Sequence, residues 1–88
     1  MNIVWTGQFK KDYKRAKRQG KPLADLRSVI QKLAGRTPLP PKNRDHPLSG
    51  RWHKHRECHV APDWLLIYRI DGDDLILERT GSHSELFG

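Results

Sequence analysis

The chain has 88 residues, which suffice for one small domain and are too few for two separate hydrophobic cores. Its single cysteine excludes an internal disulfide framework and a multi-cysteine zinc site, and no stretch approaches the roughly 20 apolar residues that span a bilayer. The formal net charge of +7 is unevenly distributed: residues 1–56 carry fifteen Lys/Arg and three Asp/Glu, whereas residues 57–88 carry two Lys/Arg and seven Asp/Glu. This strongly basic first part favours a polyanionic partner such as nucleic acid over a merely solvated surface.

The first part of the chain predicts one strand and two helices. Residues 2–6 are β-branched and aromatic and predict a strand that ends at Gly7. In residues 8–18, apolar side chains recur at helical spacing among six Lys/Arg, which predicts an amphipathic helix with a basic outer side. Pro22 suits a first helical turn, and the leucine and isoleucine spacing up to residue 33, followed by Gly35, predicts a second helix.

The rest of the chain predicts a loop and a β-meander. Four prolines make residues 37–47 an extended basic loop. Beyond it the apolar pattern has period two and predicts strands over residues 52–60, 64–70 and 75–80, joined by turns at residues 61–63 and 71–74. The order β-α-α-β-β-β predicts one α+β domain over residues 1–88, with two helices on one face of a small, twisted, mainly antiparallel sheet.

Strand alternation gives the first indication of a site. Within residues 52–60 it places His53, His55, Glu57 and His59 on one face. In the last strand it places Arg79 on the side of Leu75 and Leu77, so that an apolar row ends in a guanidinium. The alternative for Arg79 is an ordinary strand-end residue that reaches water or a carboxylate such as Asp63.

Three histidines lie at the ends of predicted elements, where sites are usually built: His46, His59 and His83. Imidazole transfers protons near neutral pH without a shifted pKa. Cleavage of RNA needs a general base, a general acid and a fixed cation on the phosphate, and acid and base are each worth about 10²–10⁴ in rate. The sequence contains all three types of group, since imidazoles can transfer protons and a guanidinium can bind phosphate oxygens.

A zinc site is the competing interpretation of H-K-H-R-E-C-H, residues 53–59. Its ligands would be His53 and His55 with Cys58 or His59, but the spacing matches no common structural zinc finger. In a regular strand Cys58 also points away from the histidine row. We therefore expect no metal and no other cofactor.

Three motifs carry a resemblance to a known family: D-H-P-L-S-G (45–50), H-V-A-P-D-W-L-L-I-Y (59–68) and E-R-T-G-S-H-S-E-L-F-G (78–88). They resemble the motifs of YafQ-type toxins, a branch of the RelE/ParE superfamily of bacterial type II toxin–antitoxin systems, and the similarity covers nearly the whole chain. It implies a RelE-like fold and a ribosome-dependent endoribonuclease that cuts mRNA in the A site, and the single cysteine favours a cytoplasmic location for it. It also implies a cognate antitoxin of the DinJ or RelB type as a partner.

The resemblance also assigns functional positions: His46, His59, Asp63, Arg79, His83 and Phe87. Arg79 would hold the scissile phosphate, His83 would be the general acid and His46 or His59 the base. Asp63 would orient a histidine or act as the base, and Phe87 would stack on a nucleobase, a contact worth ~1–3 kcal/mol. The expected contacts with RNA are basic side chains of the first helix and the loop: Lys10, Lys11, Lys14, Arg15, Lys42, Arg44 and Arg51.

Two other functions remain open. A relative could keep the scaffold and inhibit gyrase in the manner of ParE, or the chain could be a basic nucleic-acid-binding module without catalysis. Neither function needs three histidines and a carboxylate around an arginine, so this residue set favours the nuclease.

Overall fold

Five strands form one open sheet in the computed structural model, which describes residues 1–88. The strand order is β1-β5-β4-β3-β2, and only the β1–β5 pair is parallel. The strands are β1 (Asn2–Trp5), β2 (His46–Pro47), β3 (Arg56–Ala61), β4 (Trp64–Asp71) and β5 (Asp74–Gly81). The predicted mainly antiparallel sheet is therefore confirmed, with the first strand added as a parallel edge.

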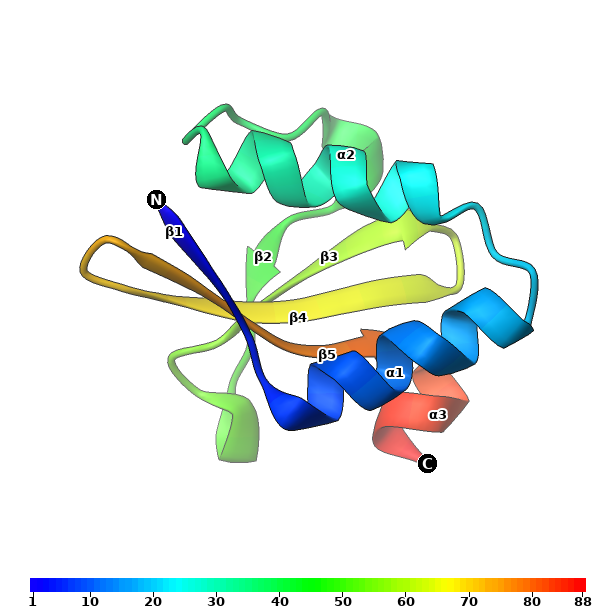
Figure 1. The fold of residues 1–88 in the computed structure, drawn as a ribbon. Coiled ribbons are helices and arrows are strands. Elements are labelled where there is room, and N and C mark those ends of the chain that lie inside the picture. The colour runs from blue at the N-terminus through cyan, green and yellow to red at the C-terminus, as the bar shows by residue number, and fades with distance from the viewer.

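Three helices pack on this sheet: α1 (Gly7–Arg18), α2 (Leu23–Ala34) and α3 (His83–Phe87). The hydroxyl of Thr6 accepts a hydrogen bond from the backbone N–H of Phe9 at 3.1 Å, which caps the start of α1. Gly35 is the C-cap of α2, as its position in the sequence predicts. In Figure 1, α2 lies over β3 and β4, while α1 lies beside the end of β5 with α3 next to it.

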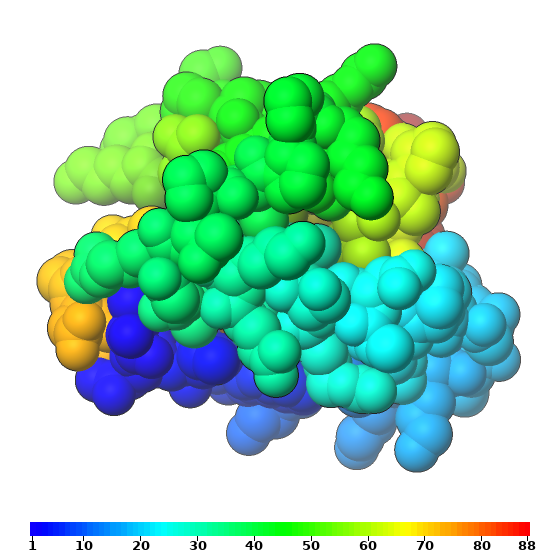
Figure 2. Space-filling view, turned by 90° about the horizontal axis from the view of Figure 1, so that it is seen from above, coloured from blue at the N-terminus to red at the C-terminus, as the bar shows by residue number.

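The main hydrophobic core lies between the sheet and the first two helices, as predicted. Its members come from α1, α2, β3, β4 and β5, and they include Phe9, Leu26, Trp64, Leu66 and Tyr68. Figure 2 shows the face covered by α2 and the loop that follows it. A smaller cluster on the opposite face joins Leu65 and Ile67 of β4 to Leu86 of α3. Strand β4 is thus buried on both faces.

The helix α3 is an element that the sequence interpretation did not include. Ser82 and Glu85 form a capping box, in which the Ser82 hydroxyl accepts from the Glu85 N–H and the Glu85 carboxylate accepts from the Ser82 N–H. Gly81 lets this helix lie close to the sheet, because a Cβ at that position would come within 2.7 Å of the Arg15 guanidinium and 3.0 Å of the Glu85 carboxylate.

The strand predicted over residues 52–60 is wrong in its first part, since β3 begins only at Arg56. Residues Gly50–Trp52 form a 3₁₀ turn instead. Gly50 and Lys54 both have a positive φ, +67° and +68°, which is incompatible with an extended strand. His53 and His55 consequently do not share a strand face with Glu57 and His59.

A β-bulge in β5 corrects a second prediction. The pairing runs Tyr68–Leu77 and then Ile67–Arg79, so Glu78 is an extra residue on β5. Paired residues of neighbouring strands point to the same face. Because Ile67 belongs to the small cluster beside α3, Arg79 lies on that face and not with Leu77 in the main core. The predicted alternation for Arg79 was therefore wrong.

The proline-rich segment is less extended than predicted. It holds a 3₁₀ turn at Pro41–Asn43 and the two-residue edge strand β2. Pro47 is tolerated there because an edge strand needs hydrogen bonds on one side only. No helix in the structure has the length and apolar character needed to cross a lipid bilayer.

Candidate active site

The candidate site lies on the face of the sheet opposite α2, next to α3 and to the side of α1 that carries Asp12. Cross-strand pairing places four residues in one row over four neighbouring strands, in the order His46, Glu57, Ile67 and Arg79. Neighbouring strands lie about 4.8 Å apart, so the backbones of Glu57 and Arg79 are roughly 10 Å apart, with Ile67 between them. The structure thus brings the predicted residues His46 and Arg79 to one surface, together with Glu57, with Ile67 as an apolar floor.

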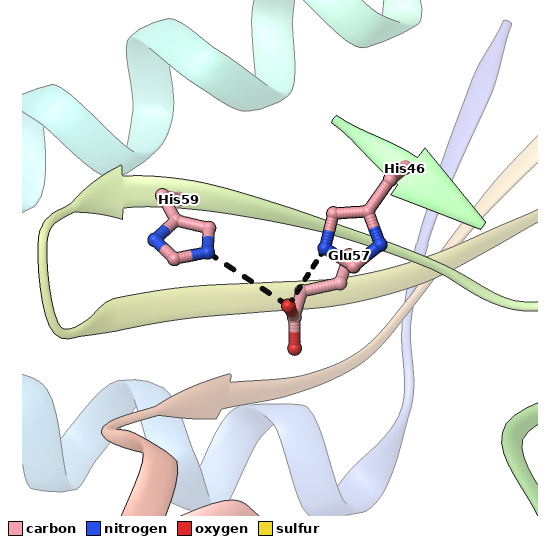
Figure 3. Close-up of side chains that lie close together, drawn as sticks. All are labelled: His46, Glu57 and His59. Atoms are coloured by element: carbon pink, nitrogen blue, oxygen red, sulfur yellow. Dashed lines mark hydrogen bonds and ion pairs between the residues drawn. The ribbon is translucent and has the colours of Figure 1, made fainter. Parts of the chain in front are cut away.

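A carboxylate between two imidazoles forms the first half of the site (Figure 3). The Glu57 Oε2 atom lies 3.1 Å from Nε2 of His46 and 3.8 Å from Nε2 of His59. Glu57 and His59 are buried, with 5% and 9% of their surface exposed, whereas the His46 side chain is 47% exposed. His46 is therefore the member of this group that a ligand can reach from solvent.

Backbone carbonyls fix both imidazoles from behind. Nδ1 of His46 donates to the carbonyl oxygen of Pro47 at 3.1 Å, and Nδ1 of His59 donates to that of Pro62 at 3.3 Å. A carbonyl oxygen only accepts, so the proton in each contact belongs to the imidazole. Asn43 anchors the loop to the same place, because its side-chain amide donates to the His59 carbonyl at 2.7 Å. In both rings Nε2 is the nitrogen that faces Glu57.

A second imidazole–carboxylate pair, His83 with Asp63, lies beside the first group. Asp63 Oδ1 accepts hydrogen bonds from the His83 backbone N–H at 3.0 Å and from its Nδ1 at 2.7 Å. These two hydrogen bonds hold the pKa of Asp63 below its ordinary value, and the bond from the His83 backbone has the larger effect. The rings of His83 and His59 are in edge contact, with centroids 5.7 Å apart. The start of α3 thus delivers His83 to the site.

Arg79 is held by a buried carboxylate of α1. Asp12, which is 1% exposed, accepts from Nε of Arg79 at 2.7 Å and from its Nη2 at 3.3 Å. It also accepts a hydrogen bond from the backbone N–H of Thr80 at 3.1 Å. Thr80 needs this side-chain acceptor because β1 pairs with β5 only as far as Leu77. The contact fixes one edge of the guanidinium, and Nη1 remains available for a ligand. The predicted alternative partner of Arg79, Asp63, is bonded to His83 instead.

Two hollows adjoin these groups. One of about 480 Å³ is lined by the loop and the β3–β4 turn, and its polar lining includes Lys42, Arg44 and His59. The other, of about 340 Å³, lies at the opposite end of the row and includes Arg51 and Arg79. Cationic side chains therefore flank the imidazoles on one side and Arg79 on the other, in places where a phosphodiester chain could cross the face.

The remaining predicted RNA contacts differ in exposure. Phe87 is 48% exposed at the end of α3, and the exposed lysines and arginines are Lys10, Lys11, Lys14, Lys42, Arg44 and Arg51. Arg15 is different, because its guanidinium lies 3.2 Å from Glu85 and 3.4 Å from Asp12 and donates to the Thr80 carbonyl. Arg15 thus joins α1 to α3.

Sequence reasoning missed Glu57 and Asp12 as members of the site. Alternation puts Glu57 in the histidine row, but it does not indicate that His46 comes from another strand to meet it. Asp12 is one acidic residue in a basic helix, and its partners are 67 and 68 residues away. Its isolation among lysines was the only available signal.

The alternative zinc set of His53, His55 and Cys58 is not assembled. Cys58 pairs with Leu66 and is buried in the main core, on the far side of the sheet from the histidines. Burial raises the pKa of its thiol to about 12, so the neutral thiol is the stable form. His55 instead contacts Glu78, with Nε2 2.9 Å from a carboxylate oxygen.

Comparison with known proteins agrees with this fold. The chain matches, over residues 1–88, the family model described as a bacterial toxin of type II toxin–antitoxin system, YafQ. The protein is therefore a toxin of the type II toxin–antitoxin class. Within that class it belongs to the YafQ family, which confirms the resemblance of its motifs.

Three relatives are closely similar over almost their full length. The mRNA interferase toxin YafQ of Escherichia coli K12 is 43% identical, and the alignment covers 99% of this chain and 96% of the relative. The crystal structure of the E. coli DinJ–YafQ complex aligns with a TM-score of 0.92, 42% identity and coverage of 99% and 98%. A metal-bound toxin from Helicobacter pylori aligns with a TM-score of 0.93, 45% identity and coverage of 99% and 99%.

Proposed function

We propose that the protein is an mRNA interferase that cleaves messenger RNA on translating ribosomes and so inhibits translation. The observation that carries this proposal is the joining of His46, Glu57, His59, Asp63 and His83 in one group on an open face, with Arg79 in the same cross-strand row. The name mRNA interferase of the E. coli relative supports the same activity.

His83 is the proposed general acid. The bond from its Nδ1 to Asp63 fixes the ring and leaves Nε2 as the nitrogen that can face the leaving 5′-oxygen. A carboxylate 2.7 Å away also stabilises the imidazolium form, which must carry the proton to be given up. Asp63 is thus a positioning residue rather than the base.

The group of His46, Glu57 and His59 supplies the proposed general base. The His59 ring lies between this group's Glu57 and the His83 ring. The base and the acid can therefore act on opposite sides of one phosphate, where one removes a proton and the other delivers one. His46 is its exposed member and is the residue that we assign to the ribose 2′-hydroxyl. The carboxylate of Glu57 stabilises the positive charge that develops on the imidazole.

The proposed reaction is an internal transesterification. The 2′-oxygen loses its proton to the base and forms a bond to phosphorus, while the bond from phosphorus to the 5′-oxygen breaks and that oxygen takes a proton from His83. The products are a 2′,3′-cyclic phosphate and a 5′-hydroxyl. Nη1 of Arg79 binds a phosphate oxygen as negative charge accumulates, and Phe87 stacks on a flanking base.

The proposed step needs no metal ion, because acid, base and cation are all side chains. Magnesium is required by the ribosome itself, so the test must use a chelator that is selective for transition metals. Cleavage that survives such a chelator, added at a concentration that leaves translation intact, supports metal independence. Loss of cleavage that added Zn²⁺ restores would contradict it.

The proposed partners are the ribosome and an antitoxin. The exposed lysines of α1 and the loop suit ribosomal RNA, since phosphate contacts dominate such binding. The DinJ–YafQ complex of the related protein supports an antitoxin that binds this chain. We expect that antitoxin to be acidic where it meets the basic surface.

Primer extension on an mRNA translated in vitro tests the function. We expect cuts that appear only when toxin and translating ribosomes are both present, and that disappear with His83→Ala and Arg79→Ala proteins whose circular dichroism spectra match the parent. Exposed His53, outside the assigned machinery, provides the control variant His53→Ala, which should cut normally. Growth arrest with intact mRNA, or with gyrase-dependent DNA breaks, would contradict the proposal.

A further inference from the structure

The β-bulge in β5 places the side chains of Glu78 and Arg79 side by side. Consecutive residues of a regular strand point to opposite faces of the sheet. Glu78 is the extra residue of the bulge, and both it and Arg79 line the hollow of about 340 Å³. Bulges next to active sites commonly re-aim a side chain in this way. The guanidinium that we assign to the phosphate therefore has a carboxylate as its neighbour.

This carboxylate is held firmly by one oxygen, while the other oxygen has no partner. The Oε2 atom of Glu78 accepts hydrogen bonds from Nε2 of His55 at 2.9 Å and from Nε of Arg69 at 3.2 Å. These two donors fix the orientation of the carboxylate. Every buried polar side-chain atom of the protein has a partner, so the unpaired Oε1 atom is exposed to solvent. The hollow therefore contains a fixed and unused hydrogen-bond acceptor.

A phosphate group does not suit this acceptor, because two anions repel each other. In RNA the groups that donate hydrogen bonds are the ribose hydroxyls and the N–H groups on the base edges. The half-buried ring of Trp52 also lines the hollow, and aromatic side chains favour the flat face of a base over a sugar. A nucleobase is thus the part of RNA that matches the hollow best.

Gln8 adds a second acceptor to the same hollow. Its Nε2 atom donates to Oδ1 of Asp12 at 3.3 Å, and since an ionised carboxylate only accepts, the amide oxygen is the end of Gln8 that remains free. Adenine, cytosine and guanine each carry an exocyclic amino group that can donate to such acceptors. Uracil has a single N–H between two carbonyl oxygens, and those oxygens would face the acceptors of the protein.

We propose that this hollow is a nucleobase subsite next to the scissile phosphate, and that Glu78 makes it select bases with an exocyclic amino group over uracil. A volume of about 340 Å³ is at the low end of the roughly 300–1,000 Å³ of small-ligand sites, which suits one nucleotide. Glu78 is a specificity-determining residue and takes no proton in the reaction. The place of the subsite beside the cut rests on the proposed function, whereas binding of the base does not.

Titration of the antitoxin-free toxin with AMP, CMP, GMP and UMP, followed by NMR, tests the subsite without any cleavage. The signals to follow are the indole N–H of Trp52 and the side-chain amide of Gln8. We expect them to report an affinity at least about tenfold lower for UMP than for the other three nucleotides. Equal affinity for all four nucleotides, or no shift of either signal, would overturn the subsite.

The variant Glu78→Gln should reverse this preference. His55 and Arg69 fix the amide oxygen at the position of Oε2, so the amide NH₂ replaces the free acceptor by a donor with almost the same shape. UMP should then bind at least as tightly as the other nucleotides. The matched control Asp73→Asn removes an exposed carboxylate from the turn before β5 and should keep the parent's order. A Glu78→Gln protein with the parent's order would contradict the role of Glu78.

Cleavage assays separate the subsite from the nuclease. The substrates are translated mRNAs that differ in one nucleotide beside a mapped cut, with each base in turn on each side. The parent should cut slowest with uracil at one of the two positions, and Glu78→Gln should remove that difference. Base selection in the NMR titration without ribosome-dependent cleavage contradicts only the nuclease. Cleavage that is indifferent to uracil at both positions overturns the place of the subsite beside the phosphate.

Discussion

At the scale of single residues, the most informative contact is the one between Asp12 and Arg79. The buried carboxylate holds Nε and Nη2 of the guanidinium, so Arg79 is oriented before any substrate arrives. Arg15 and the Thr80 N–H share the same carboxylate, which makes Asp12 the centre of a small charge network between α1 and β5. The two partners of this contact should therefore differ in what their loss does.

Replacement of Arg79 by Ala should affect activity more than stability. Asp12 would keep the Thr80 N–H and Arg15, so we expect the free energy of unfolding to fall by only about 1 kcal/mol. Loss of a phosphate contact made in the transition state should lower the cleavage rate about 10²–10³-fold. Urea unfolding and single-turnover cleavage measure the two quantities.

Replacement of Asp12 by Ala should instead reduce stability strongly. It leaves a buried N–H without an acceptor and two guanidinium groups without their carboxylate, so we expect a loss of about 3 kcal/mol. Asp12→Asn should recover part of that loss, because the amide oxygen can still accept from Thr80. Equal destabilisation by Arg79→Ala and Asp12→Ala would contradict this account of the network.

At the scale of elements, the short helix α3 is the part of the fold on which the site depends most. It brings His83 to Asp63 and Leu86 to the apolar floor, although it has only five residues. A helix of this length is not stable alone, so caps and packing must hold it. Its capping box and the contact from Arg15 to Glu85 supply that support.

Removal of the cap should therefore displace His83. We expect Ser82→Ala to cost about 1 kcal/mol in local stability of α3 and to lower cleavage several-fold. The matched control is Ser28→Ala on α2, an exposed mid-helix position where Ala is the better helix former and stability should rise by a few tenths of a kcal/mol. Hydrogen exchange of the α3 amides is the measurement. Unchanged exchange in Ser82→Ala would contradict the role of the cap.

Acid should release the same helix. Hydrogen bonds lower the pKa of Asp63, chiefly from the His83 backbone, and of Glu85, chiefly from the Ser82 backbone. Carboxylates with a lowered folded-state pKa stabilise the fold fully above their ordinary values of 3.8 and 4.5, and this contribution is lost as pH falls through the lowered values. The His83 amide signal in NMR should therefore shift below about pH 4, and Asp63→Asn should remove part of that change.

The elements also indicate what the sequence could predict. Periodicity and turn residues placed α1, α2, β4 and β5 to within a residue or two, because local patterns decide those elements. The bulge at Glu78 depends on pairing between two strands, so the side on which Arg79 lies could not be derived from alternation. The S-x-x-E pattern at residues 82–85 is a local signal for α3 that the sequence interpretation overlooked.

For the site, the histidines at element ends were predicted and their partners were not. The pairing register between β2 and β3 cannot be derived from the sequence, and it is this register that places His46 beside Glu57. Asp12 likewise needs the docking of α1 against β5 to become a ligand of Arg79. These contacts are tertiary, so composition and spacing carry no record of them.

At the scale of the whole molecule, the uneven charge should govern binding to the ribosome. Lys14 is exposed on α1, beside the strand that carries Arg79, whereas Lys32 is exposed on α2, which covers the opposite face of the sheet. We expect Lys14→Glu to weaken ribosome binding and to reduce the slope of log affinity against log salt by about one.

The control for this prediction is Lys32→Glu, which changes the net charge equally. It should bind ribosomes nearly as the parent does, because its site faces away from the candidate active site. Sedimentation with ribosomes at several salt concentrations measures both variants. Equal losses in the two proteins would mean that total charge, and not the α1 surface, decides the affinity.

Strand β4 has main-core residues on one side and the floor of the site on the other, with Leu66 and Ile67 as adjacent examples. A genetic screen for cells that survive toxin expression should therefore recover inactive alleles of two origins along this single strand. Both residues are fully buried, so polar changes at either should yield little folded protein, whereas the conservative change Ile67→Val should yield protein that accumulates and still titrates the antitoxin. Immunoblots of the survivors would sort the alleles into these separate phenotypes.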